Sequence, residues 1–280
     1  MSKGVLLFAS NNGMIDYVKQ AHFLALRIRK YLDLPTTIVT DIDVKKDYPN
    51  FVTAFDKIIL VESMQANFTN KRYNDGSLAK RVLPFNNGNR AYAYELSPYD
   101  ETIVMDTDFI ISNDILNQCF AQQKDLLLYN DAVHIGTLTK PFEFERISDT
   151  GIEFYWATVF FFRKTEINKI FFDLIKHIKE NYYHYRSVYQ FKTSVFRNDI
   201  AFSIAVHIMN GYQTGNFAGV LPGKHYYCID RDLLCNLKND EFSVLVEKPD
   251  RLGEYLPVKI TGSNLHVMNK FSLERAIDNQ

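Results

Sequence analysis

"ETIVMDTDFIIS" (residues 101–112) decides the fold prediction for this chain. An apolar run from Thr102 to Met105 leads into Asp106-Thr107-Asp108, and the chain is apolar again at 109–111. Short apolar runs bounded by polar residues are typical of strands that are buried on both faces. The stretch is therefore predicted to be a buried strand that carries two carboxylates.

The two carboxylates point to a metal ion. In an extended strand residues i and i+2 point to the same side, so Asp106 and Asp108 are expected to converge. Two uncompensated buried carboxylates would repel each other and lose hydration. Mg²⁺ or Mn²⁺ removes both penalties and commonly bridges carboxylates to a diphosphate. The simpler alternative is that the strand ends at Met105 and both carboxylates are solvated in a turn.

The segments around this stretch alternate between strand and helix patterns. Residues 16–34 have apolar side chains at helical spacing, Asp16 as a candidate N-cap and Pro35 just past the end. Strands are predicted at 5–10, 36–41, 57–63, 103–111, 125–131 and 154–164, further helices at 165–181 and 199–210, and an irregular tail with short strands at 221–271. This order predicts an α/β fold with a mainly parallel central sheet flanked by helices.

Composition limits the class of protein. The 280 residues are 46% hydrophobic, which is ample for one large core, and the net charge of −1 argues against a bulk polyanion binder while leaving local patches open. Three cysteines without a CxxC pair (Cys119, Cys228 and Cys235) argue against a disulfide framework or zinc site. With no signal-peptide pattern or membrane-length apolar run, a soluble cytoplasmic protein is expected.

The segment "RAYAYELSPYDETIVMDTDFII" (90–111) resembles the region around the DxD motif of GT-A fold glycosyltransferases, most closely the glycogenin-like family 8 enzymes. Arg90 lies sixteen residues before Asp106, the offset at which that family places its donor-binding Lys or Arg. The resemblance implies one GT-A domain over 1–280. Its nucleotide-sugar-binding half would be 1–131, and its acceptor half, with a C-terminal metal and diphosphate element, 132–280.

Four further pieces occur in the family's order. Residues 5–11 resemble its first strand, whose end holds the nucleotide, and 157–162 stand where it has a small-residue strand, although Trp156-Ala157-Thr158 replaces its Asn and Gly. Residues 198–207 resemble a helix that carries Asp199. Residues 265–271 resemble the C-terminal HxGxxKP element, with His266 and Lys270 one residue closer together and no Gly or Pro.

The resemblance and the strand-end positions together imply a set of site residues. Ligands of parallel sheets bind at the carboxyl ends of strands, which Asn11, Asp41 and Asp106 follow. The implied metal ligands are Asp106, Asp108 and His266; the implied donor-binding residues are Ala9, Asn11, Tyr17, Asp41, Arg90, Thr107 and Lys270; and Asp199 is the implied catalytic residue. The implied reaction is transfer of a sugar from a nucleotide sugar, with UDP favoured and with retention of configuration; no general base is assigned.

Several of these residues have simpler alternatives. His266 could be an ordinary buried histidine, and Lys270 and Arg90 could be solvated surface cations. Tyr17 could pack in the core rather than stack on a base, and Asp41 could cap a turn. Asp199 could be the N-cap of the helix at 199–210.

The acceptor is predicted from a basic and aromatic segment. Residues 163–197 hold eight Lys/Arg against three Asp/Glu, and 70–81 add four more basic residues. Basic side chains can hold phosphates while aromatic side chains stack on bases, including a base turned out of a duplex. The candidate acceptor-binding residues are Trp156, Tyr185, Arg186, Lys192 and Arg197. The alternative is an ordinary helix and loop with core aromatics and solvated charges.

The stretch 16–41 resembles glycosyltransferase-like proteins of tailed phages, some of which glycosylate hydroxymethylated pyrimidines in their own DNA. This resemblance implies 5-hydroxymethylcytosine in DNA as acceptor, arabinose as one candidate sugar, and the host cytoplasm as location. A glycan or protein acceptor is the competing possibility. A sugar nucleotidyltransferase is a second, although Ser10-Asn11-Asn12-Gly13 makes a poor phosphate loop, and a non-catalytic binding protein is a third.

Overall fold

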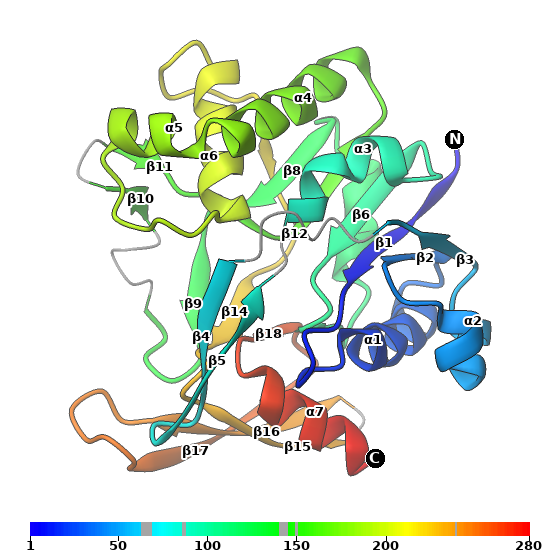
Figure 1. The fold of residues 1–280 in the computed structure, drawn as a ribbon, viewed down its shortest axis with the longest axis vertical. Coiled ribbons are helices and arrows are strands. Elements are labelled where there is room, and N and C mark those ends of the chain that lie inside the picture. Colours follow the sequence, from blue (N-terminus) through cyan, green and yellow to red (C-terminus); the bar gives the residue numbers. More distant parts are fainter. Residues whose placement is uncertain (63–68, 86–87, 140–144, 149–150, 239) are drawn as a thin grey trace.

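The computed structural model describes residues 1–62, 69–85, 88–139, 145–148, 151–238 and 240–280. Seven strands form a central sheet in the order β13-β8-β12-β6-β1-β2-β3 (Figure 1). They are β1 (Lys3–Ala9), β2 (Thr36–Thr40), β3 (Lys57–Leu60), β6 (Glu101–Met105), β8 (Leu126–Tyr129), β12 (Trp156–Arg163) and β13 (Gly219–Val220). All neighbours pair in parallel except at β12, which is antiparallel to β6 and β8. The predicted mixed α/β fold with a mainly parallel sheet is confirmed.

Helices flank this sheet (Figure 1). They are α1 (Tyr17–Tyr31), α2 (Val44–Asp47), α3 (Ala93–Leu96), α4 (Glu166–Glu180), α5 (Tyr182–Tyr189), α6 (Asn198–Met209) and α7 (Lys270–Asp278), with 3₁₀ turns η1 (Pro49–Ala54), η3 (Gly88–Tyr92) and η4 (Ile115–Ala121). The Asp16 side chain accepts the Lys19 N–H, which confirms the predicted N-cap of α1. That helix ends earlier than predicted because Asp33 has a left-handed backbone, with φ of 52°.

The aromatic strand β12 lies at the centre of the sheet. Its residues from Trp156 to Phe162 are all buried, because β6 and β8 cover its two edges and α6 packs on it. Continuous burial explains why its sequence shows no alternation. The predicted strand at 57–63 is shorter, ending at Leu60, and residue 63 lies outside the described residues.

The prediction of one continuous strand through the aspartates is wrong. Strand β6 ends at Met105, and Asp106-Thr107-Asp108 form a tight turn in which the Phe109 N–H donates to the Asp106 carbonyl at 3.0 Å. The chain then enters β7 (Phe109–Ile110), which belongs to a second sheet. Yet the alternative of two solvated carboxylates does not hold either, since Asp108 is only 3% exposed and the Asp106 side chain is 16% exposed. The turn therefore joins two sheets at a buried corner.

Three smaller sheets complete the described fold beside a short β10-β11 pair. A four-stranded sheet has the order β7-β18-β14-β9, and a three-stranded sheet has the order β15-β16-β17. Their strands are β9 (Ala132–His134), β14 (His225–Cys228), β15 (Leu233–Lys238), β16 (Glu241–Glu247), β17 (Tyr255–Thr261) and β18 (Leu265–Val267); the others are the hairpin β4 (Thr69–Asp75) and β5 (Ala79–Phe85), and β10 (Arg146–Ile147) and β11 (Ile152–Glu153). The tail predicted to be irregular with short strands thus supplies all of the three-stranded sheet and two strands, β14 and β18, of the four-stranded one.

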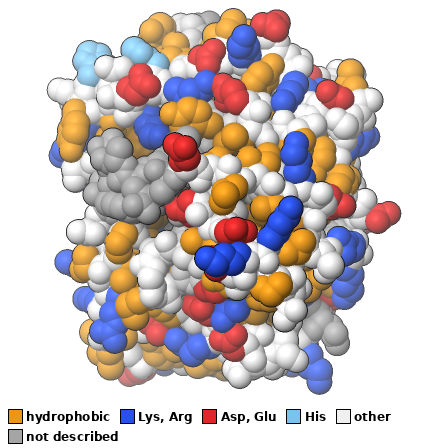
Figure 2. Space-filling model, turned by 45° about the vertical axis from the view of Figure 1, so that its right-hand side comes forward, with side chains coloured by type: hydrophobic (Ala, Val, Ile, Leu, Met, Phe, Trp, Pro, Cys, Tyr) orange, Lys and Arg blue, Asp and Glu red, His pale blue; other side chains and the backbone are white. Residues whose placement is uncertain are grey.

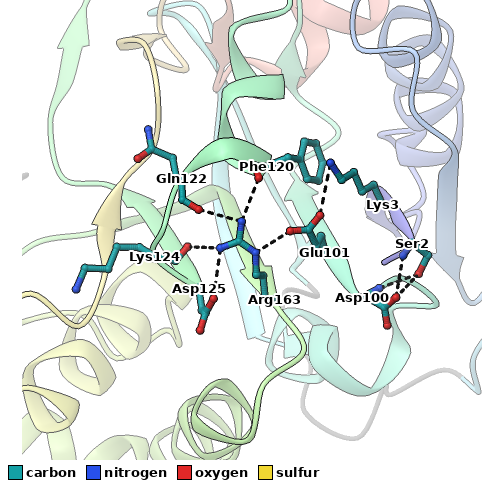
Figure 3. A network of polar contacts seen from close by, with 9 residues as sticks. All are labelled: Ser2, Lys3, Asp100, Glu101, Phe120, Gln122, Lys124, Asp125 and Arg163. Carbon is teal, nitrogen blue, oxygen red and sulfur yellow. Dashed lines mark hydrogen bonds and ion pairs between the residues drawn. The ribbon is translucent and has the colours of Figure 1, made fainter.

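A polar cluster around Arg163 stabilises the end of the central sheet at which β1 and β6 begin (Figure 3). The Arg163 Nε donates to the Glu101 carboxylate at 2.7 Å, and Lys3 lies 3.7 Å from the same carboxylate. The remaining guanidinium bonds go to the carbonyls of Phe120, Gln122 and Lys124 and to the Asp125 carboxylate. The opposite end of the sheet, where the carboxyl ends of the parallel strands lie, is the end at which a ligand site is expected.

Charges are mixed on the face of the molecule drawn in Figure 2. Figure 2 shows Lys and Arg interspersed with Asp and Glu on the face drawn, without a wide field of one sign. This agrees with the net charge of −1. Within the described residues, no helix combines the length and apolarity needed to span a bilayer.

Candidate functional site

A cavity of about 590 Å³ opens at the carboxyl ends of β1 and β6. Of the residues predicted to form a site, it is lined by Ala9, Tyr17, Arg90, Asp106, Thr107, Asp108, Trp156, Arg197, Asp199, His266 and Lys270. Asn11, Asp41, Tyr185, Arg186 and Lys192 do not line it. The fold thus brings side chains from both halves of the chain into one space.

Asp106, Asp108 and His266 form a candidate metal centre. One ligand atom from each lies within 4.8 Å of the others. The turn brings this about: β18 pairs with β7 immediately after Asp108, and the Val267 N–H donates to the Asp108 carbonyl at 2.9 Å. His266 Nε2 lies 3.4 Å from the Asp108 carboxylate, while its buried Nδ1 has no hydrogen-bond partner among the described residues. Two carboxylates and an imidazole suit Mn²⁺ or Mg²⁺.

Two cations lie against these carboxylates. Lys270 Nζ is 2.5 Å from Asp108, and Arg90 is ion-paired with Asp106 while it donates to the Ala157 carbonyl at 3.1 Å. Burial by itself would raise the pKa of Asp108, but Lys270 and His266 hold it well below its ordinary value. Burial lowers the pKa of Arg90, against the opposing effect of Asp199 and Asp108. Asp108 is therefore ionised, and each carboxylate of the turn has a cationic partner.

Asp199 lies on the far side of Arg90, in the first turn of α6. It accepts the Ala157 N–H at 2.8 Å and pairs with Arg197 at 3.0 Å. Burial would raise its pKa, yet Arg197, the Ala157 N–H and Arg90 keep it lowered. The N-cap alternative is wrong, because α6 begins at Asn198 and the N-cap position belongs to Arg197. The carboxylate instead faces the cavity from a fixed position.

The residues predicted to bind the donor differ in whether their polar atoms are free to contact a ligand. Tyr17 lines the cavity with its hydroxyl 3.4 Å from that of Tyr73. The Asn11 amide is used within the protein, donating to the Tyr48 hydroxyl and accepting from the Val18 N–H. Asp41 accepts from Ser10 through one carboxylate oxygen, and its other, buried oxygen has no hydrogen-bond partner in the described part of the chain.

Thr107 and the predicted acceptor-binding residues also differ in how far they contact the cavity. Thr107 is 5% exposed and donates to the Gln20 side chain, so its cavity contact is small. Trp156 and Arg197 line the cavity, although Trp156 is 1% exposed. Tyr185 and Arg186 lie on α5, and Lys192 lies in the loop that follows it. Lys192 is exposed, Tyr185 and Arg186 are half-buried, and none of the three lines the cavity.

The β4-β5 hairpin is a part of the site that was not predicted as a structural element, although its basic residues at 70–81 were counted toward the acceptor prediction. It contributes Lys71, Arg72, Tyr73 and Phe85 to the cavity wall. Its tip is tied to C-terminal elements: Asp75 forms a two-contact ion pair with Arg275 at 2.7 and 2.8 Å, and Ser77 bonds to Glu247 and Tyr255. Asn74-Asp75-Gly76 between two strand-like runs was the available signal, because Asp-Gly favours tight hairpins.

Lys71 on this hairpin is a cation without an acidic partner. No ion pair of Lys71 is present among the described residues, and its ammonium lies 4.7 Å from the Phe85 ring centre. The Lys71 side chain is exposed and lines the cavity. Desolvation by the surrounding protein, with repulsion from Lys270 and Arg197, lowers the pKa of Lys71 to about 8. An anion in the cavity would relieve that repulsion.

No family model and no curated protein matches this chain. Among solved structures it is similar to the glycosyltransferase GlyE of Streptococcus pneumoniae TIGR4, with 11% identity and a TM-score of 0.45 over 79% of this chain and 45% of that one. The apo form of GlyE matches with the same identity and TM-score over 74% and 43%. TarS of S. aureus matches with 14% identity and a TM-score of 0.42 over 81% and 36%. This chain therefore spans less than half the length of these three structures.

Proposed function

We propose that this chain is a metal-dependent glycosyltransferase that uses a nucleotide sugar, with UDP as the nucleotide. The observation that carries the proposal is the meeting of Asp106, Asp108 and His266 with Arg90 and Lys270 in one cavity. Carboxylates and an imidazole suit a divalent ion, and adjacent cations suit the diphosphate that such an ion carries. Retention of configuration is part of the proposal and is supported only by the resemblance to family 8.

The protein's own residues would divide the work. Asp106, Asp108 and His266 would hold Mn²⁺ or Mg²⁺, which as a Lewis acid neutralises charge on a diphosphate leaving group. Lys270 and Arg90, now paired with carboxylates, would turn to the diphosphate oxygens, where charge grows in the transition state. Asp199, held by Arg197 and the Ala157 N–H, would orient a sugar or acceptor hydroxyl. Asp41 lies behind the cavity residue Ser10, whose hydroxyl it holds at 2.8 Å, and would serve the uracil or ribose through that serine.

For the acceptor we propose hydroxymethylated cytosine in DNA, with a glycan or protein as the competing acceptor. Among the described residues the cavity wall has six cations against four carboxylates, the cations being Lys71, Arg72, Arg90, Arg197, Arg231 and Lys270 and the carboxylates Asp106, Asp108, Asp199 and Asp230. This excess of cations suits a site that binds phosphate groups of a DNA acceptor in addition to the diphosphate of the donor. The location that follows from this proposal is the cytoplasm of a phage host.

The reaction itself is tested by offering a panel of nucleotide sugars with Mn²⁺ and hydroxymethylated DNA, followed by mass spectrometry of the nucleosides. Release of free nucleoside diphosphate with a sugar on the nucleoside supports the proposal. Release of pyrophosphate from a nucleoside triphosphate and a sugar phosphate would instead identify a nucleotidyltransferase. No product and no nucleotide binding would leave a non-catalytic protein.

Lys71→Met is expected to weaken UDP binding about tenfold and to leave uridine binding unchanged. One charge-assisted hydrogen bond to phosphate contributes roughly 1.5 kcal/mol, which is about a factor of ten. Calorimetry with UDP and with uridine, in the presence of Mn²⁺, measures the difference. Lys192→Met is the matched control, because Lys192 lies outside the cavity. An equal loss for uridine would show that Lys71 acts only on the shape of the hairpin.

Arg186→Ala combined with Lys192→Ala is expected to lower the salt dependence of duplex DNA binding. Each lost phosphate contact reduces the slope of log affinity against log salt by about 1. Fluorescence anisotropy at several salt concentrations measures that slope. Lys45→Ala with Lys46→Ala, on the exposed side of α2, is the matched control. Absent or salt-insensitive DNA binding by the unmodified protein would favour a glycan or protein acceptor.

A further inference from the structure

His225 on β14 is a fully buried histidine, 0% exposed, behind the candidate metal centre. Neither of its ring nitrogens has a hydrogen-bond partner among the residues that the structure describes. Aromatic rings surround it: Phe109 is stacked in parallel at 5.9 Å, Tyr129 lies at 4.9 Å and Trp156 at 5.0 Å. Packing alone would be served by a phenylalanine, so the imidazole is a polar group that requires another explanation.

The imidazole of His225 could serve a neighbouring group as a hydrogen-bond partner. A neutral imidazole carries one N–H donor and one acceptor nitrogen. In that form, the ring of His225, buried and unpartnered in the described part of the chain, offers an acceptor inside the core.

His266 has a buried ring nitrogen that lacks a hydrogen-bond partner within the part of the chain that the structure describes. Its Nε2 faces Asp108 at 3.4 Å, and its Nδ1 is buried without a partner in the described residues. The two rings are neighbours, with centres 5.6 Å apart. They lie on adjacent parallel strands, where Tyr227 pairs with His266 and His225 shares a face with Tyr227. A direct bond after a small ring rotation, or one bridging water, spans this separation.

We propose that His225 is a positioning residue that accepts the Nδ1–H of His266, directly or through one water. Donation of Nδ1–H fixes the tautomer in which Nε2 carries a free lone pair toward Asp108 and the metal ion. Metal-ligating histidines are generally held in this way by a partner on the other ring nitrogen, and loss of that partner lowers metal affinity about 10- to 100-fold. The inference rests on the metal site of the proposed function.

The Nδ1–H proton of His266 provides a test that does not depend on turnover. In the protein labelled with ¹⁵N and saturated with Mg²⁺, NMR is expected to show His266 with a protonated Nδ1 whose proton exchanges slowly with water. In His225→Phe, which keeps an aromatic ring among Phe109 and Trp156, that proton is expected to exchange faster. An exchange rate that the substitution leaves unchanged would overturn the proposal.

Metal affinity provides the second test. Titration with Mn²⁺ followed by electron paramagnetic resonance is expected to show binding about 10- to 100-fold weaker in His225→Phe. His225→Asn and His225→Gln place an amide oxygen near the positions of Nδ1 and Nε2, and one of them is expected to restore most of the affinity. His22→Phe is the matched control, because His22 stacks on Phe51 outside the cavity.

The outcomes separate this inference from the proposed function. Tight Mn²⁺ binding that is unchanged in His225→Phe would overturn the role of His225 and leave the metal site standing. No Mn²⁺ binding by the unmodified protein would overturn the metal site. Two nitrogen couplings to bound Mn²⁺ would make His225 a ligand and would also overturn the positioning role.

Discussion

Asp108→Asn is expected to lower metal-dependent sugar transfer by roughly a thousand-fold, because the amide removes one ligand charge and one anchor of the diphosphate-bound ion. Asp108 is the residue of the centre with most contacts, lying 2.5 Å from Lys270 and 3.4 Å from His266. Transfer rates at saturating Mn²⁺, with and without chelator, measure the effect. The stabilisation of the protein by Mn²⁺ in thermal unfolding is expected to disappear in the same variant.

Asp114→Asn is the matched control for this variant, because Asp114 follows Asp108 by six residues but is exposed and outside the cavity. Its transfer rate is expected to equal that of the unmodified protein. Full activity of Asp108→Asn, or of the unmodified protein in excess chelator, would refute the metal mechanism.

Arg163→Met is expected to lower the free energy of unfolding by about 3 kcal/mol, because it leaves the buried Glu101 carboxylate without its main partner. The Glu101 side chain is 7% exposed, and Arg163 also bonds three carbonyls of the η4 region (Figure 3). Urea unfolding measures the change. Arg163→Lys is expected to recover only part of it, since an ammonium lacks the planar fork.

Arg251→Met is the matched control for stability. Arg251 makes an exposed ion pair with Glu254, and such pairs contribute no more than about 1 kcal/mol. A loss below about 1 kcal/mol in Arg163→Met would show that the cluster in Figure 3 is tolerant of an unpaired carboxylate.

Most of the central sheet could be predicted because its strands are short apolar runs with clear ends, but the two-residue edge strand β13 was not predicted. The run 5–10 and the helix after Asp16 follow directly from residue type and spacing. The break at 106–108 could not be predicted, because apolar residues continue on both sides and only tertiary pairing shows that β6 and β7 belong to different sheets. Asp106 and Asp108 were expected to converge because residues i and i+2 of a strand point to the same side. In the structure they converge because a tight turn brings them together.

The rest of the cavity depends on contacts between residues distant in sequence. Lys71 reaches it because the hairpin tip is bound by Arg275, and nothing in the local pattern indicates that pairing. No sequence motif indicates a role for His225, because the residues that surround it come from β7, β8, β12 and β18. Asp199 was singled out through the resemblance, but its fixed position depends on Arg197 and on the start of β12.

The corner at Asp108 has a consequence for synthesis on the ribosome. Lys270, the partner that neutralises this carboxylate, is translated 162 residues later. Until that lysine and His266 emerge from the exit tunnel, the nascent chain has an acidic corner that is costly to bury. Native closure of the central sheet onto the later strands is therefore expected to wait for the end of translation, and prematurely terminated chains are expected to remain open there and to be degraded.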